Sequence, residues 1–332
     1  MSSLPESNQA ATVAAVGQVR RLSFHGTGGS LFGIFIVNLL LILVTLGTYY
    51  VWAKVKIRRY LWSQTEFEGD RFAYAGTGSE LFIGWLKAAL VFGIPFVLLK
   101  NGGEWLGVEP WLQWVAAIVA YGISLVFLPV AIVGARRYRL SRTSWRGIRF
   151  SFRGRAADFI KLFVKGSLLS AITLGLYSPL FATQRYRFLV SHSYFGHERF
   201  GFDAGDRDLF WRFILAVALT IPTLGLYWFW FLAEKQRFFW DHTFFATARF
   251  RSTVTGRRLL LLKLGNLLLL VVSGGLAWPW VKGRNIRFIL DNLTLEGPLD
   301  LAGIQQQALL APAFGEGLAS FFDILDTGLD LG

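Results

Sequence analysis

Five arginines, each followed by an aromatic residue, are the residues whose type and spacing most strongly suggest a binding role. The spacings between successive pairs are 78, 50, 50 and 50 residues. A guanidinium group presents a planar fork of N–H donors that matches carboxylate and phosphate. The alternative is that these arginines anchor the chain at a membrane surface and pair with acidic side chains. We predict that they bind anionic lipid head groups or another anion: Arg59, Arg137, Arg187, Arg237 and Arg287.

Four polar residues interrupt long apolar stretches: Asn38, Lys87, Lys165 and Asn266. Lys87 and Lys165 occupy equivalent positions, about seven residues into their stretches. A charge inside hydrocarbon is costly and usually has a function, so one prediction is that the four residues line a polar cavity. The other is that the lysines extend their amines to the membrane surface from one or two helical turns below it. The sequence leaves both open.

The sequence contains no pattern typical of an enzyme or a metal site. It has no cysteine and four histidines, and the histidines do not form an HExxH motif. His192 and His242 occupy the position that holds Gln64 and Asn292 in related segments. That position indicates a hydrogen-bonding role rather than metal ligation. We therefore expect no enzymatic activity, no catalytic residue, no metal and no cofactor.

The apolar and basic composition predicts an integral membrane protein. Hydrophobic residues make up 54% of the 332 residues and charged residues 17%, whereas soluble domains carry about 25% charged residues. The mean hydropathy is +0.45. The net charge of +13 is concentrated at the ends of the apolar blocks, which favours contact with anionic lipids over nucleic acid.

A unit of about fifty residues recurs along the chain. In the first four copies, a Ser or Thr stands five residues after the aromatic of the Arg–aromatic pair, and another aromatic follows two residues later. Each unit predicts a short strand, an apolar helix, a break at a Leu-Gly element and a basic helix. The predicted organisation is a disordered tail at 1–21, a membrane domain at 22–300 and an amphipathic acidic tail at 301–332. The five repeats are expected at 22–71, 72–149, 150–199, 200–249 and 250–300.

The apolar blocks predict how the chain meets the membrane. Each is long enough to cross about 30 Å of hydrocarbon as a helix. We therefore predict an all-α integral membrane protein of about six apolar segments, with short cytoplasmic β-strands between the repeats. Two topologies remain open: six single spans, or re-entrant hairpins that turn at the Leu-Gly element and leave both termini in the cytoplasm. The blocks fall at about 31–53, 81–100, 111–134, 157–182, 209–233 and 259–281.

Three sequence features together resemble a known family. They are LGxYxxW followed by a basic helix, FxGxRFxYxGTG from Phe67 to Gly78, and EGLASFFDI near the end of the chain. This combination resembles the YjgN-like bacterial inner-membrane proteins, a family of unknown function, over about residues 22–329. The resemblance implies a multi-pass protein of the bacterial inner membrane. It implies no activity and no catalytic residues.

Two functions remain open on this basis. The first is a non-enzymatic, homo-oligomeric membrane scaffold that engages anionic lipids and shapes the bilayer. The second is a channel or transporter for an anionic or small polar solute, through a cavity between the repeats. The scaffold depends on features of every repeat, whereas the transport function depends on lysines in two of them. We therefore predict the scaffold.

Overall fold

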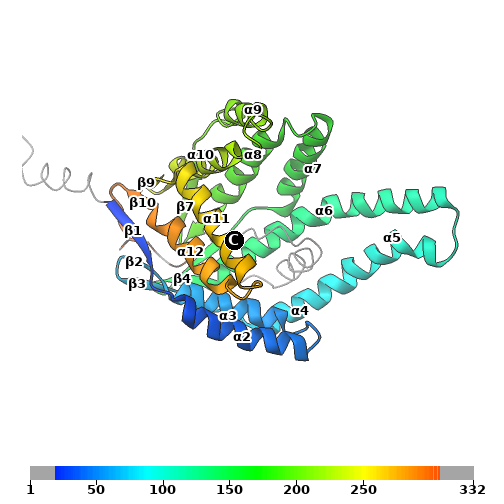
Figure 1. The fold of residues 1–332 in the computed structure, drawn as a ribbon, viewed down its shortest axis with the longest axis horizontal. Coiled ribbons are helices and arrows are strands. Elements are labelled where there is room, and N and C mark those ends of the chain that lie inside the picture. Colours follow the sequence, from blue (N-terminus) through cyan, green and yellow to red (C-terminus); the bar gives the residue numbers. More distant parts are fainter. Residues whose placement is uncertain (1–18, 302, 305, 307–332) are drawn as a thin grey trace, which may run out of the picture.

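Ten short strands form a closed antiparallel barrel in the computed structural model, which describes residues 19–301, 303, 304 and 306 (Figure 1). The order around the barrel is β1-β10-β9-β8-β7-β6-β5-β4-β3-β2. β1 pairs with β10, with Val19 opposite Glu296, so the first and last described strands close the barrel. The strands are β1 Val19–Phe24, β2 Thr65–Phe67, β3 Asp70–Tyr74, β4 Thr143–Trp145, β5 Ile148–Phe152, β6 Ser193–Phe195, β7 Glu198–Phe202, β8 Thr243–Phe245, β9 Ala248–Ser252 and β10 Leu293–Glu296.

Tight turns connect the strands at one end of the barrel. β2 continues into β3 through Glu68 and Gly69, whose φ angles are 51° and 79°. β4 continues into β5 through Arg146 and Gly147, at 49° and 76°. Two successive residues with positive φ are typical of the two-residue hairpin turns that suit strand twist. These turns leave the other end of the barrel for the helices.

Five helical hairpins connect the strands at the opposite end. Each hairpin starts where one strand ends and returns to the start of its antiparallel neighbour, so all five leave the same end of the barrel. The hairpin of α5 and α6 reaches farthest from the barrel (Figure 1). The helices are α2 Gly28–Val44, α3 Tyr50–Ser63, α4 Gly78–Ala88, the π-helical segment η1 Ala89–Gly93, α5 Ile94–Trp105, α6 Pro110–Arg142, α7 Ala156–Ile172, α8 Ser178–Ser191, α9 Phe210–Ala218, α10 Tyr227–Asp241, α11 Gly256–Val272 and α12 Trp278–Asp291.

A Leu-Gly element reverses the chain inside three of the apolar blocks, and Gly274 with Gly275 does so inside a fourth. Leu46 and Gly47 have φ angles of 50° and 89°, and Leu174 and Gly175 have 49° and 89°. The preceding threonine holds each turn: Thr45 Oγ1 donates to the Leu41 carbonyl at 2.7 Å and accepts from the Tyr49 N–H at 3.0 Å. Leu224 with Gly225, and Gly274 with Gly275, also have positive φ angles. Glycine adopts this left-handed conformation without steric cost.

The prediction of an all-α protein with six apolar segments is wrong. The described residues contain a ten-stranded closed barrel and two helical segments long and apolar enough to cross a membrane, Gly78–Trp105 and Pro110–Arg142. The blocks at 31–53, 157–182, 209–233 and 259–281 each fold into two antiparallel helices instead of one. Predicting one membrane span from each apolar block therefore gave too many spans, because the turn at the centre of these four blocks reverses the chain. The predicted tails at 1–21 and 301–332 lie largely outside the described residues.

Aromatic side chains fill the barrel. The buried cluster contains Phe67, Phe72, Trp145, Phe195 and Phe245, together with Ala248, Leu295 and Ile304. Trp145 pairs with Phe72 across β3 and β4, and its Nε1–H donates to the carbonyls of Phe67 at 3.2 Å and Asp70 at 3.1 Å. Inward-facing residues of a small barrel pack as a solid core. The recurring aromatic of the sequence unit is therefore a core residue.

Replacing Trp145 with alanine tests this core. Removing a buried tryptophan from a packed cluster is expected to lower the free energy of unfolding by about 3–5 kcal/mol. The measurement is denaturant unfolding of the full chain in detergent. The matched control is Trp114→Ala, because Trp114 is 73% exposed on α6. Equal losses in the two variants would contradict the assignment of Trp145 to the core.

Candidate functional site

Four of the five recurring arginines join one hairpin to the next. Arg59 Nη2 donates to the Gly76 carbonyl at 3.0 Å, and Arg137 Nη2 donates to the Gly154 carbonyl at 2.7 Å. Arg187 donates to the Ala204 carbonyl and also pairs with Asp206. Each acceptor lies 17 residues ahead, in the turn between a strand and its following helix. These guanidinium groups therefore fasten one unit to the next.

The same contact closes the ring of hairpins. Arg287 Nη2 on α12 donates to the Gly26 carbonyl before α2, at 3.2 Å and a separation of 261 residues. Arg237 occupies the equivalent position on α10. A charge-assisted hydrogen bond to a backbone carbonyl stabilises more than a neutral one. Binding of lipid or anion by the five arginines stays a prediction, and the structure shows intramolecular partners for four of them.

A tryptophan packs on a glycine at three of the junctions between hairpins. A Cβ added at Gly78 would lie 2.2 Å from Trp52, and one added at Gly28 would lie 2.2 Å from Trp280. At Gly256 it would lie 2.6 Å from the ring of Trp230 and 2.8 Å from its Cα atom. Only a residue without a side chain allows this approach.

The other two junctions lack both members of the pair. Leu180 and Asp206 replace the tryptophan and the glycine where the third repeat meets the fourth, and Asp206 forms an ion pair with Arg187. Val130 and Ala156 replace them where the second repeat meets the third. Because tryptophan and glycine are lost together, their contact explains why they recur.

The structure separates the four polar residues of the apolar stretches. Lys87 and Lys165 are exposed, whereas Asn38 and Asn266 are buried. Asn266 Nδ2 donates to Asn285 Oδ1 on α12 at 2.8 Å. Both amide atoms of Asn38 and the Oδ1 atom of Asn266 are buried without a hydrogen-bond partner among the described residues. The four residues therefore do not line one common cavity.

The two histidines of the recurring position cap helices. His192 Nδ1 lies 2.8 Å from the Phe188 carbonyl, and His242 Nδ1 lies 2.8 Å from the Phe238 carbonyl. Asn292 makes the same contact through Nδ2, at 2.8 Å from the Phe288 carbonyl. These side chains contact carbonyls of the last helical turn, where backbone N–H partners become scarce. The contact explains why His and Asn share this position.

Apolar side chains at the turns of the short hairpins are almost fully exposed. Leu46, Leu174 and Leu224 are 93%, 94% and 92% exposed. We call these three leucines the hairpin tips. Val44, Ile172 and Ile221 beside them are also exposed. Exposed apolar residues gathered at the ends of hairpins mark a surface that meets a nonpolar environment.

Three cations on neighbouring helices are a feature that the sequence analysis missed. They are Arg136 on α6, Arg185 on α8 and Lys235 on α10. Burial lowers the pKa of the Arg185 guanidinium. Burial also lowers the pKa of the Lys235 ammonium, and the positive charge of Arg185 lowers it further. No spacing signal identifies them, because Arg185 and Lys235 share a position with Ile57 and Ala135.

Comparison with known proteins identifies the family. Residues 19–229 and 219–321 match the family described as bacterial protein of unknown function (DUF898). This chain belongs to the DUF898 family. No solved structure matches it.

Curated relatives of this DUF898 protein confirm the resemblance to YjgN. The chain is 34% identical over 131 residues to inner membrane protein YjgN of Salmonella typhimurium, covering 40% of this chain and 31% of the relative. It is 35% identical over 129 residues to inner membrane protein YjgN of Escherichia coli K12, covering 39% of this chain and 30% of the relative. The aligned part thus spans less than a third of these relatives. The similarity supports a membrane protein of the bacterial inner membrane.

Gly256→Ala tests the packing between hairpins. The added methyl group meets the Trp230 ring and its backbone, so we expect the free energy of unfolding to fall by about 1–3 kcal/mol. Gly33→Ala is the control, because a Cβ at Gly33 in α2 meets nothing within 4 Å and alanine favours helix. The double variant Gly256→Ala with Trp230→Ala should lose less than the sum of the two single losses. Strict additivity in denaturant unfolding would contradict the contact.

Proposed function

We propose that this DUF898 protein is a non-enzymatic scaffold of the bacterial inner membrane, held by five hairpins of unequal depth. The four short hairpins enter one leaflet, and the hairpin of α5 and α6 crosses the bilayer. The barrel lies outside the hydrocarbon, on one side of the membrane. The five hairpins run from the barrel into the bilayer. The exposure of Leu46, Leu174 and Leu224 carries this proposal.

The length of the apolar tips supports insertion to half depth. From α2 into the following turn, exposed apolar residues recur between Val37 and Leu46. A helix rises 1.5 Å per residue, so this stretch is about 15 Å long. The hydrocarbon core of a bilayer is about 30 Å thick. The tips of the short hairpins therefore reach about the middle of the bilayer.

The long hairpin has the dimensions of a spanning pair. Its first arm, Gly78–Trp105, contains 28 residues, which is about 42 Å of helix. Trp105, Trp111 and Trp114 are exposed around the far turn. Tryptophan favours the interface between membrane and water. These residues fit a belt at the opposite surface of the membrane.

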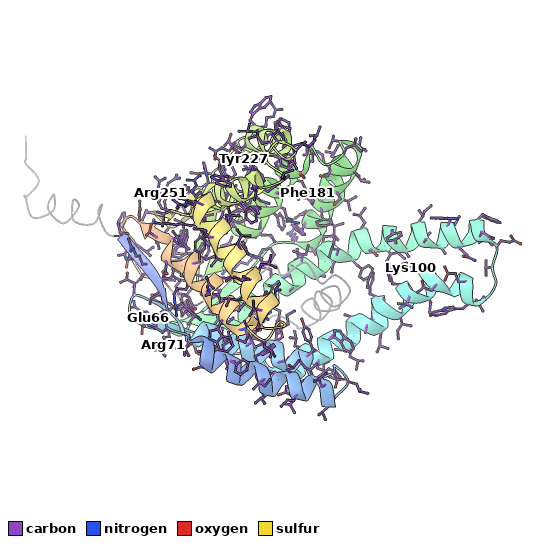
Figure 2. All side chains as sticks on the ribbon, in the orientation of Figure 1. Glu66, Arg71, Lys100, Phe181, Tyr227 and Arg251 are labelled. Carbon is purple, nitrogen blue, oxygen red and sulfur yellow. The ribbon has the colours of Figure 1, made fainter. Side chains whose placement is uncertain are left out.

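Charge supports a cytoplasmic barrel. Arg71 and Arg251 lie at the barrel, whereas Lys100 lies out along the long hairpin (Figure 2). The far turn of that hairpin carries the exposed acids Glu104 and Glu109. Basic residues favour the cytoplasmic side of bacterial membranes. The same basic residues would face the anionic lipids of the inner leaflet.

Unequal insertion supports a role in shaping the bilayer. Four hairpins add area to one leaflet, whereas one hairpin adds area to both. A difference in area between leaflets favours bending, as amphipathic helices do when they insert on one side. The aromatic core of the barrel disfavours a solute path along the barrel axis in the described part of the chain. Transport and homo-oligomerisation stay predictions.

Introduced cysteines test the depth of each hairpin, because the chain has no cysteine. Arg71→Cys is expected to react with an impermeant maleimide only from the cytoplasm, and Leu106→Cys only from the periplasm. Leu46→Cys, Leu174→Cys and Leu224→Cys should react from neither side. Periplasmic labelling of the tip variants would show that the short hairpins cross the bilayer. Cytoplasmic labelling would show that they lie outside it.

Reconstitution tests the shaping of the membrane. The protein is expected to tubulate liposomes that contain anionic lipid, as seen by electron microscopy. The triple variant Leu46→Asn, Leu174→Asn, Leu224→Asn should lose this activity, because polar tips resist insertion, and the long hairpin should still hold it in the membrane. Leu106→Asn is the control, since that turn is expected in water. Intact spherical liposomes with solute flux would contradict the scaffold and favour transport.

A further inference from the structure

The chain beyond β10 turns over the end of the barrel at which the tight turns lie, the turn end. Gly297 has a φ angle of 121°, a conformation that favours glycine. Its carbonyl accepts from Arg20 Nη1 of β1 at 3.2 Å. The Pro298 carbonyl accepts from Thr247 Oγ1, in the turn between β8 and β9. These contacts direct the chain away from β10 and across the turn end.

The same segment reaches the opposite wall of the barrel. Gln306 Oε1 accepts from the Arg149 N–H of β5 at 2.7 Å. β10 and β5 are five positions apart in either direction around the closed barrel, so they lie opposite each other. The segment therefore crosses the full width of the turn end. We call its described residues the strap: Gly297, Pro298, Leu299, Asp300, Leu301, Gly303, Ile304 and Gln306.

Ile304 anchors the strap in the barrel core. Its side chain is 6% exposed and belongs to the buried cluster that contains Trp145 and three phenylalanines. These four aromatic residues are the last residues of β2, β4, β6 and β8, directly before the turns. Leu299 and Leu301 pack partly buried against the same cluster. The strap thus covers an aromatic surface, which we call the mouth: Phe67, Trp145, Phe195 and Phe245.

The strap is held less firmly than the strands. Its residues belong to no helix or strand, whereas every barrel strand is paired on both sides. Gln306 is exposed, and its side chain makes one hydrogen bond within the described part of the chain. Asp300 Oδ1 accepts from the Gly303 N–H at 3.3 Å, so that bond lies within the strap itself. A segment with few hydrogen bonds and few buried side chains opens locally before the whole structure unfolds.

The mouth and its edge suit an extended peptide segment. Aromatic rings from four strands surround the side chain of Ile304, and the Arg149 N–H at the edge is a donor to Gln306. Leaving the rings in contact with water is unfavourable, so the mouth favours an apolar side chain of similar size. Extended peptides are recognised by main-chain hydrogen bonds together with pockets for their side chains.

We propose that the mouth is a binding site for an extended apolar segment, and that the strap is the latch that occupies it. The closed strap blocks the site from within the same chain, which is an autoinhibitory contact. Release of Gln306 and Ile304 lets the strap turn about Gly297 and frees the mouth. The latch is independent of hairpin depth, because its contacts lie at the turn end and the hairpins leave the opposite end of the barrel.

Introduced cysteines in the full chain in detergent measure the opening, because the chain has no cysteine. Gly303→Cys is exposed and should react fast with a maleimide, whereas Val254→Cys, at a buried position among the helices, should react only on global unfolding. Ile304→Cys is expected to react at a rate between the two. Its rate should also depend less on urea than that of Val254→Cys, since local opening exposes less surface.

Loss of the Gln306 contact should favour the open strap. Gln306→Ala is expected to raise the rate of Ile304→Cys about two- to tenfold, the effect of one neutral hydrogen bond. Gln113→Ala is the matched control, because Gln113 donates to the Val108 carbonyl at the far turn of the long hairpin, and it should leave that rate unchanged. A rate of Ile304→Cys equal to that of Gly303→Cys, or equal to that of Val254→Cys, would overturn the latch.

A fluorescent peptide with the sequence of residues 298–306 tests the mouth. It is expected to bind the full chain that carries Ile304→Asp, because the strap then lacks its apolar anchor. The wild-type chain should bind at least about tenfold more weakly, since its mouth is free only in the open fraction. Gln306→Ala, which keeps the apolar anchor, should bind the peptide more tightly than the wild type. Absence of binding to both variants would overturn the site and would leave the membrane proposal unaffected.

Discussion

Closure of the strand ladder is the constraint on which the rest of this structure depends. β2, β4, β6 and β8 have three residues each, and a strand of that length is unstable unless both of its edges are paired. Pairing of β1 with β10 removes the last two edges. Because neighbouring strands are antiparallel and every helical hairpin joins two neighbours, closure also directs all five hairpins to one end of the barrel. The orientation of the apolar tips follows from the hydrogen bonding of the strands.

Contacts between consecutive hairpins reinforce that closure. Arg59 and Arg137 fasten the second helix of a unit to the turn that starts the next, and Arg287 returns to the first unit across 261 residues. The pairs of tryptophan and glycine add close packing at three of the five junctions. These arginines are thus part of the structure that holds the ring.

Unequal hairpin length connects the fold to the membrane. The second repeat exceeds the others by 28 residues, and its helices are the two segments of the described chain that are long and apolar enough to span a bilayer. Its partners turn after about 17 residues, as α2, α7 and α11 show. The ring therefore presents apolar tips at two distances from the barrel. We propose that this face of the molecule meets lipid.

The sequence by itself determined the apolar character and the period of the units, because these depend on composition and on residues close together in the chain. It indicated a break at the Leu-Gly element but left open whether the chain turns back there. It also placed the aromatic residues at 67, 145, 195 and 245 in equivalent positions. Only the tertiary structure decided that these aromatics fill a barrel, that Arg287 reaches Gly26, and that Lys87 is exposed while Asn38 is buried. The physical reason is that three-residue strands carry almost no local signal, and their pairing joins residues as distant as Val19 and Glu296. An all-α protein was therefore predicted where strand pairing over long separations produces a barrel.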